Sequence, residues 1–306
     1  MLTYYYKTTK QDVFTNIEEP KHGCWIHVDE ATLNDLQKIC NLTGLEISDL
    51  NDSLDRYELP RIESIDQNIL LHTRHPIDNE GHLHTITLTI LMTNHYFVTI
   101  SPIQNNIILS IINKKSVLSS LQHSEMLTHL LLRLTQEFTV QIRKARHNVM
   151  TQEKEMIHVE SEDISALTRY EEILNQYLSS LVPLRSVLES LVISKFTNFV
   201  EKDQQHLDDV LNTVKQSEDL CDIVIKTIRS LRDSYQIIFA NNLTKTIKLL
   251  TALTIIFSVP TMIASIYGMN ISLPIAKNPH AFAILMIVIV ICSGLCGYLF
   301  HRKKWL

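Results

Sequence analysis

The sequence is short of glycine and proline, and this scarcity excludes one class of protein while it indicates a kind of architecture. It has six glycines and eight prolines in 306 residues, and the glycines are scattered. A glycine-rich phosphate-binding loop is therefore missing, which argues against a nucleotide-driven pump. No glycine lies between Gly81 and Gly268, and no proline lies between Pro102 and Pro183. A stretch so free of helix breakers is predicted to form long helices.

Strong charge and paired cysteines are also lacking. A net charge of -5 gives no basic surface for nucleic acid, and no RNA-binding motif is present. The five cysteines are odd in number and lack paired spacing, which argues against a disulfide framework. No nucleophile, base and orienting group stand out together, and His84 and His95 on predicted strands are expected to be structural. We therefore predict neither an enzyme nor an organic cofactor.

Two long uncharged runs stand at the C-terminal end, at 249–267 and 281–300. Each is about as long as a helix needs to be to cross a hydrocarbon core, and two in succession are hard to explain as buried helices of a soluble protein. The N-terminus has neither the apolar core of a signal peptide nor the arginine-rich pattern of a transit peptide. Membrane insertion is therefore expected to come from these two spans, with the lipid bilayer as a partner.

Basic residues predict the orientation of the two spans. Lys245 and Lys248 lie just before the first span, and the tail 301–306 after the second is basic, whereas the loop 268–280 carries only Lys277. Positive charge favours the cytoplasmic side. Both termini are thus predicted to be cytoplasmic, in a cell membrane.

The segment 1–122 reads as a small cytosolic α/β domain. Strands are predicted at 68–75, 82–92 and 95–101, where polar and apolar residues alternate, and a helical stretch lies near 30–55. The predicted fold class is therefore an α/β N-terminal domain joined to long helices and two transmembrane helices.

The helical part begins with a predicted antiparallel hairpin of long helices over 123–200. Its first helix carries apolar residues at steps of three and four, among them Leu127, Leu130, Leu131, Leu134, Phe138 and Ile142. A stalk helix over 201–248 is expected to continue without a break into the span 249–267. From 204 to 267 such a helix is roughly 95 Å long, and its apolar stripe needs neighbouring helices of the same chain or of other copies.

The first span has one narrow polar face. Its hydroxyl residues recur at steps of three and four, and the same series extends back into the stalk: Thr244, Ile247, Thr251, Thr254, Ser258, Thr261 and Ser265. Such a face either packs against other membrane helices or lines a wet pore. A single helix cannot enclose a hole and the second span has no matching stripe, so both interpretations predict an oligomer.

The first span ends in Tyr267-Gly268-Met269-Asn270, one short loop before the last span and the basic tail. In this placement the tripeptide Gly-Met-Asn resembles the CorA family of magnesium channels. The resemblance covers nearly the whole chain, because the segments 54–63, 183–188 and 248–256 are also similar to family segments.

The resemblance implies a funnel-shaped homopentamer that passes divalent cations, magnesium above all, down their electrochemical gradient. It implies that Gly268, Met269 and Asn270 form the selectivity filter, where five neutral Asn270 amides hydrogen-bond the hydration shell of the ion without stripping it. Gly268 is expected to allow the sharp turn that directs Asn270 inward.

The resemblance also implies regulation by magnesium inside the cell. The matching carboxylates are Asp78, beyond the predicted strand 68–75, and Asp209 and Asp233 on the stalk. With Asn270 they are the predicted metal-binding residues. Bound ions between neighbouring subunits would hold the pore shut, and their loss would free the subunits; ordinary solvated carboxylates are the alternative.

Two features depart from the family pattern. The outer loop 271–280 has no acidic residue, and the hydroxyl stripe leaves only Ile247 and Leu250 as a candidate hydrophobic constriction. Two alternatives stay open: a zinc or cobalt/nickel transporter of the same fold, which Met269 disfavours, and a membrane-anchored coiled-coil scaffold, which needs neither a polar stripe nor Asn270.

Overall fold

The structure is a computed structural model that describes residues 1–79, 82–115, 118–155, 160–193, 201–270, 274 and 279–305, without the side chains of 78, 79, 82, 83, 152–155 and 201–203. The chain divides into two compact units. The first comprises Met1–Ile157 and Ser165–Ser230, and the second comprises His158–Ile164 and Leu231–Leu306.

The first unit is built on a seven-stranded mixed sheet in the order β2-β1-β3-β7-β6-β5-β4. Its strands are β1 (Leu2–Tyr6), β2 (Thr15–Ile17), β3 (Cys24–Val28), β4 (Arg61–Ile65), β5 (Asn68–Asn79), β6 (His82–Met92) and β7 (Tyr96–Ile100). The central pair β3 and β7 is parallel, whereas β5 and β6 form a long antiparallel hairpin that holds Ile69 opposite Met92 and Ile77 opposite His84.

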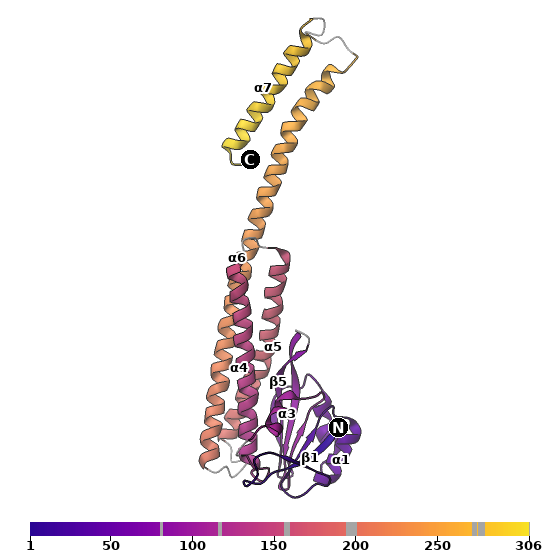
Figure 1. Ribbon diagram of the computed structural model, residues 1–306, viewed down its shortest axis with the longest axis vertical. Coiled ribbons are helices and arrows are strands. Elements are labelled where there is room, and N and C mark those ends of the chain that lie inside the picture. The colour runs from indigo at the N-terminus through magenta and orange to yellow at the C-terminus, as the bar shows by residue number, and fades with distance from the viewer. Residues whose placement is uncertain are drawn as a thin grey trace. The chain divides into compact units, whose positions relative to one another are not determined.

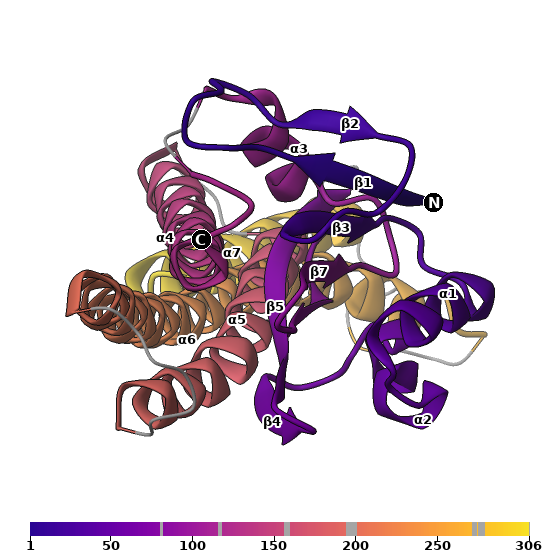
Figure 2. The ribbon, with the colours of Figure 1, turned by 90° about the horizontal axis from the view of Figure 1, so that it is seen from below.

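Helices cover both faces of this sheet (Figure 2). On one face lie α1 (Leu33–Thr43), α2 (Ile47–Leu50) and the short 3-10 helix η1 (Asn51–Leu54), and on the other lie α3 (Asn106–Asn113) and α4 (His123–Glu155). Thr32 and Asp35 form a capping box that starts α1, and Gly44 ends it at a φ of 78°.

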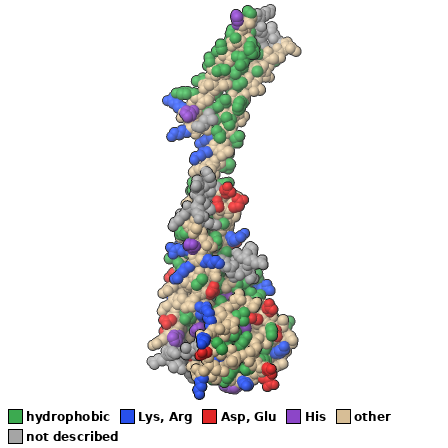
Figure 3. All heavy atoms as spheres, in the orientation of Figure 1, with side chains coloured by type: hydrophobic (Ala, Val, Ile, Leu, Met, Phe, Trp, Pro, Cys, Tyr) green, Lys and Arg blue, Asp and Glu red, His purple; other side chains and the backbone are tan. Residues whose placement is uncertain are grey.

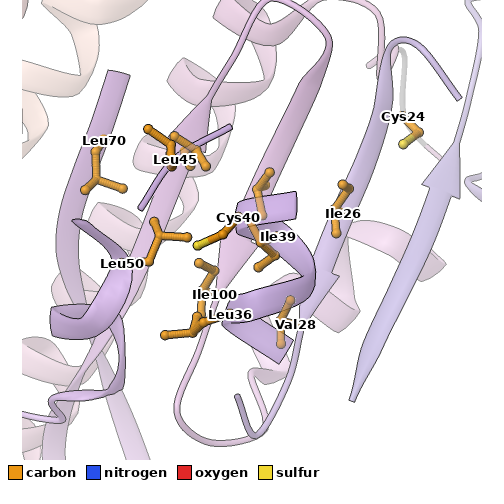
Figure 4. Close-up of a cluster of buried hydrophobic side chains, with 12 residues drawn as sticks. Cys24, Ile26, Val28, Leu36, Ile39, Cys40, Leu45, Leu50, Leu70 and Ile100 are labelled. Atoms are coloured by element: carbon orange, nitrogen blue, oxygen red, sulfur yellow. The ribbon is translucent and has the colours of Figure 1, made fainter. Parts of the chain in front are cut away.

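The core beneath α1 follows from the alternation of apolar side chains along the strands. Figure 4 shows Leu36 and Ile39 of α1 pointing toward Ile26 and Val28 of β3 and Ile100 of β7. All five are completely buried. Burial of side chains of this size stabilises the fold by roughly 1.5–3 kcal/mol each.

The first unit continues into a helical bundle made of α4, α5 (Ser161–Ile193) from Ser165 onward, and the first part of α6 (Glu201–Tyr267). All six apolar residues that the sequence pattern placed on one face of the first long helix are buried. Phe138 of α4 meets Tyr177 of α5 edge to face at 5.5 Å. The Cys221 thiol of α6 donates a hydrogen bond to the Leu174 carbonyl oxygen of α5 at 3.2 Å.

The second unit contains the rest of α6, from Leu231, and α7 (Ala281–Arg302). Figure 1 shows α7 running alongside the end of α6. As predicted, α6 passes without a break from the stalk into the first apolar span, with Pro260 inside it. The predicted fold class is confirmed for the chain: a mixed α/β domain, long helices and two apolar helices at the C-terminal end.

Candidate ion-conduction surface

Two helices have the length and composition to cross a membrane: the C-terminal part of α6, and α7. Apart from Ala252, their apolar side chains are not buried in the chain: no described residue of α7 is buried, and large apolar side chains such as Phe257 and Phe282 are 68 % and 78 % exposed. Figure 3 shows hydrophobic side chains over both helices. They therefore differ from the core helices of a soluble protein, and a lipid phase or further chains must cover them.

Every residue of the predicted pore-lining series is exposed on α6, from Thr244 through Ile247 to Ser265. The helical period places these positions on one face. The hydroxyls of Thr244, Thr254 and Thr261 each donate a hydrogen bond to the carbonyl oxygen four residues earlier, at 2.8, 2.8 and 2.9 Å. The Ser258 hydroxyl donates to the Ile255 carbonyl oxygen at 3.1 Å.

These bonds determine which hydrogen-bonding role the stripe can play. A hydroxyl has one hydrogen to donate and two lone pairs to accept with. Because Thr254, Ser258 and Thr261 give their hydrogens to the helix backbone, the groups that remain for solvent are acceptors. A hydrated cation presents the hydrogens of its water shell outward, so a ladder of acceptors suits a hydrated cation better than a hydrated anion.

The Gly-Met-Asn tripeptide directly follows the last turn of α6. The Gly268 N–H donates to the Ala264 carbonyl oxygen at 3.0 Å, and the Met269 N–H donates to the Ile266 carbonyl oxygen at 3.3 Å. Asn270 follows this tightened turn and is exposed. The rest of the predicted outer loop, 271–273 and 275–278, lies outside the described residues.

The turn does not use the special freedom of glycine that we expected at Gly268. Among the described glycines, those with a left-handed φ are Gly23 and Gly44. A Cβ at Gly268 would lie 3.5 Å from the carbonyl oxygens of Ala264 and Ser265, an ordinary contact distance. In this single chain, therefore, neither backbone strain nor crowding explains why this residue is glycine.

The three predicted regulatory carboxylates lie on two elements, Asp78 on β5 and Asp209 and Asp233 on α6. Asp209 is exposed in the first unit and Asp233 is exposed in the second. The backbone of Asp78 lies in β5 opposite Leu83, and its side chain is outside the described residues. Within the described part of the chain, no three His, Cys, Asp or Glu side chains form a ready metal site. A site that uses Asp78 and Asp209 therefore remains a prediction about neighbouring copies.

Two of the segments that carry the family resemblance have structural roles. In the segment 54–63, the Arg61 guanidinium pairs with Glu58 and lies 2.6 Å from carboxylate oxygens of both Asp52 and Glu63. It thereby ties η1 to the start of β4. In the segment 183–188, Leu184 and Leu188 are buried in the helical bundle, so similarity there reflects packing.

Comparisons with known proteins agree over the full length of the chain. The cobalt/magnesium transport protein CorA of Methanocaldococcus jannaschii is 25% identical over 289 residues, which are 92% of this chain and 91% of that protein. The cobalt/magnesium transport protein CorA of Thermotoga maritima is 21% identical over 98% of this chain and 88% of its own length. The complete structure of the M. jannaschii CorA magnesium transporter superposes with a TM-score of 0.79 at 22% identity, and covers 100% of this chain and 99% of that one.

The family model for CorA-like Mg2+ transporter proteins matches residues 20–302. That range holds strands β3 to β7 of the sheet, the helical bundle, both apolar helices and the Gly-Met-Asn tripeptide. The family consists of transporters rather than enzymes, which agrees with the prediction from the residues. Since the match spans nearly the whole sequence, the chain belongs to the CorA family of divalent cation transporters.

Proposed function

We propose that this chain is one subunit of a channel that carries magnesium into the cell down its electrochemical gradient. The observation that carries the proposal is the ladder of outward-facing acceptor oxygens on α6, which leads to Asn270 at the helix end. Magnesium holds its water tightly. A wall of neutral acceptors can hydrogen-bond the intact shell, and five Asn270 amides can do the same at the mouth.

Assembly into a pentamer is part of this proposal, and the stalk supports association of copies. In the second unit, α6 carries four large apolar side chains before Lys245 that are 39–63 % exposed: Ile237, Ile238, Phe239 and Leu243. These side chains precede the predicted membrane span, so lipid does not account for them. Copies of the same helix packed around an axis would cover them.

Uptake in cells that lack their own magnesium transport tests the role of Asn270. We expect the parent chain to restore growth at low magnesium and Asn270→Ala to fail, because the mouth loses its amide ring. Asn241→Ala, at an exposed asparagine of α6 outside the stripe, is the matched control and should restore growth. Rescue by Asn270→Ala would remove the role given to the amide, and failure of the parent would favour a scaffold.

We further propose that internal magnesium closes the channel by binding between neighbouring subunits at Asp78 and Asp209, while Asp233 lies near the pore axis. Losing these ions would free the subunits. The double variant Asp78→Ala with Asp209→Ala is expected to lose inhibition of the current by internal magnesium. Asp208→Ala, which removes an exposed carboxylate one residue away, serves as the control. Inhibition that persists in the double variant would contradict the proposal.

Both termini are proposed to face the cytoplasm in the cell membrane, since the basic residues flank the two spans on one side. Tags at the N- and C-termini should then be inaccessible, in intact cells, to a labelling reagent that does not cross the membrane.

Cobalt transport is the second candidate function, because two similar proteins bear the name cobalt/magnesium transport protein. Uptake of Mg2+, Co2+, Ni2+ and Zn2+ by purified protein in liposomes, measured singly and in competition, would rank the ions.

A further inference from the structure

Two histidines far apart in sequence meet at one edge of the central sheet. His22 precedes β3 and His95 precedes β7, and these strands are parallel neighbours with Cys24 opposite Tyr96. The backbone N–H of Gly23 donates to the His95 carbonyl oxygen at 2.7 Å. This bond fixes the backbones of the two segments side by side, and the two imidazoles contact each other there.

The spacing of the two rings matches that of two ligands of one metal ion. Their centroids are 4.8 Å apart and their planes cross at 73°. With a metal–nitrogen bond of about 2.0–2.1 Å, the centroid of a bound imidazole lies about 3.2 Å from the ion, so two imidazoles at 90–110° lie about 4.5–5.2 Å apart. An edge-to-face aromatic contact covers the same range, which makes the chemistry around the pair decisive.

That chemistry favours a cation. His22 and His95 are both exposed, so their ring nitrogens are accessible to an ion from solution. A third histidine, His123, lies with Nδ1 3.1 Å from the carbonyl oxygen of Thr93, two residues before His95. A carbonyl only accepts, so Nδ1 carries the hydrogen, and the buried Nε2 keeps a lone pair that has no partner among the described residues.

We propose that His22 and His95 together bind one divalent transition-metal ion of the class Co2+, Ni2+ or Zn2+. Because no three such side chains converge in the described structure, two imidazoles provide the protein ligands and water fills the other positions. Imidazole nitrogen suits these metals, whereas Mg2+ prefers oxygen. The site thus differs in chemistry and in place from the proposed magnesium path, and lies in the first unit rather than on the membrane spans.

The test is a calorimetric titration of Ni2+ into the metal-stripped, full-length protein in excess Mg2+. The parent is expected to bind one Ni2+ per chain at a site that Mg2+ does not occupy. His22→Ala and His95→Ala should each weaken binding about tenfold or more, a loss of ~1.4 kcal/mol or more. His147→Ala, at an exposed histidine of α4, is the matched control and should bind as the parent does.

Thermal unfolding supplies a second readout that separates folding from binding. Both histidines are exposed, so the variants should unfold at the temperature of the parent without metal and should lose the rise that Ni2+ gives the parent. No Ni2+ binding by the parent in excess Mg2+, or equal binding by parent and both variants, would overturn the proposal. Asn270→Ala should bind Ni2+ normally, so failure of the channel proposal and failure of this one are distinguishable.

Discussion

The acceptor character of the hydroxyl stripe can be tested by replacing its hydroxyls with methyl groups of nearly the same size. In the double variant Thr254→Val with Thr261→Val, each side chain keeps its β-branch and loses one oxygen. Valine and threonine have similar helix propensities. The hydroxyls bond only to the backbone of their own helix, so we expect the helix to persist and the exposed face to become apolar.

The expected effect on transport follows from the hydrogen bonds that a hydrated ion loses. In a ring of symmetry-related copies, each substitution removes one acceptor from every subunit. If an ion passing a ring makes about three hydrogen bonds of ~1 kcal/mol each to it, their loss raises the barrier by ~3 kcal/mol, or roughly a hundredfold in rate.

The assay is magnesium flux into liposomes that contain the purified protein, with a magnesium-sensitive dye inside. Thr246→Val is the matched control: its hydroxyl makes the same kind of bond, to the Asn242 carbonyl oxygen at 3.1 Å, but it lies off the stripe. We expect near-parental flux from the control and a fall of about two orders of magnitude from the double variant. If the double variant conducts magnesium as fast as Thr246→Val does, the assignment of this face to the ion path is refuted.

Two further predictions concern the stability of the first unit. Gly23→Ala and Gly44→Ala, at φ values of 77° and 78°, should each cost ~1 kcal/mol of stability and lower the melting temperature by the same amount. A new Cβ at Gly23 would meet the tip of the half-exposed Leu121 side chain, which can move aside. A penalty several times larger at Gly23 than at Gly44 would show that Leu121 is fixed. Burial lowers the pKa of His72 and of His75 to about 4. Between pH 6.5 and 4 the unfolded chain then binds protons that the folded chain excludes, so acidification through this window should remove up to about 3 kcal/mol per histidine. Melting curves at pH 7.5 and 4.5 measure this, and His72→Gln should flatten the dependence; identical curves for the parent at both pH values would contradict it.

Periodicity in the sequence predicts the helical part of the fold well, because each long helix has to bury a stripe. The apolar residues at steps of three and four, such as Leu134 and Phe138, are buried as expected. The absence of breakers correctly indicates that α6 continues into the first span. The strands at 68–75, 82–92 and 95–101 correspond to β5, β6 and β7, although β5 runs on to Asn79.

The sequence gives weaker guidance where structure depends on distant partners. The short strands β1 and β2 are held in the sheet through β3, and segments of five and three residues carry too little periodicity to identify. The pairing of His22 with His95 has no local signal either. The parallel alignment of β3 and β7 brings the two rings together. Because the sequence does not show this alignment, it predicts only a structural role for His95. The roles of Asp78, Asp209 and Asn270 stay predictions, because they concern other copies and ions.

One helix carries both the predicted sensor and the predicted pore wall, and this continuity gives a physical basis for coupling between them. Asp209 and the hydroxyl stripe both lie on α6, which is helical throughout Glu201–Tyr267, and Asn270 follows its end. A helix resists stretching, so a shift of the Asp209 end must appear as tilt or rotation farther along. Between Ser258 and Thr261 of the stripe, Pro260 removes one backbone donor and frees the carbonyl of the preceding turn, so bending costs least there. A gating motion that starts at Asp209 is therefore expected to change the direction of the stripe as a body, with any bend concentrated near Pro260, rather than to pass through a relay of side chains.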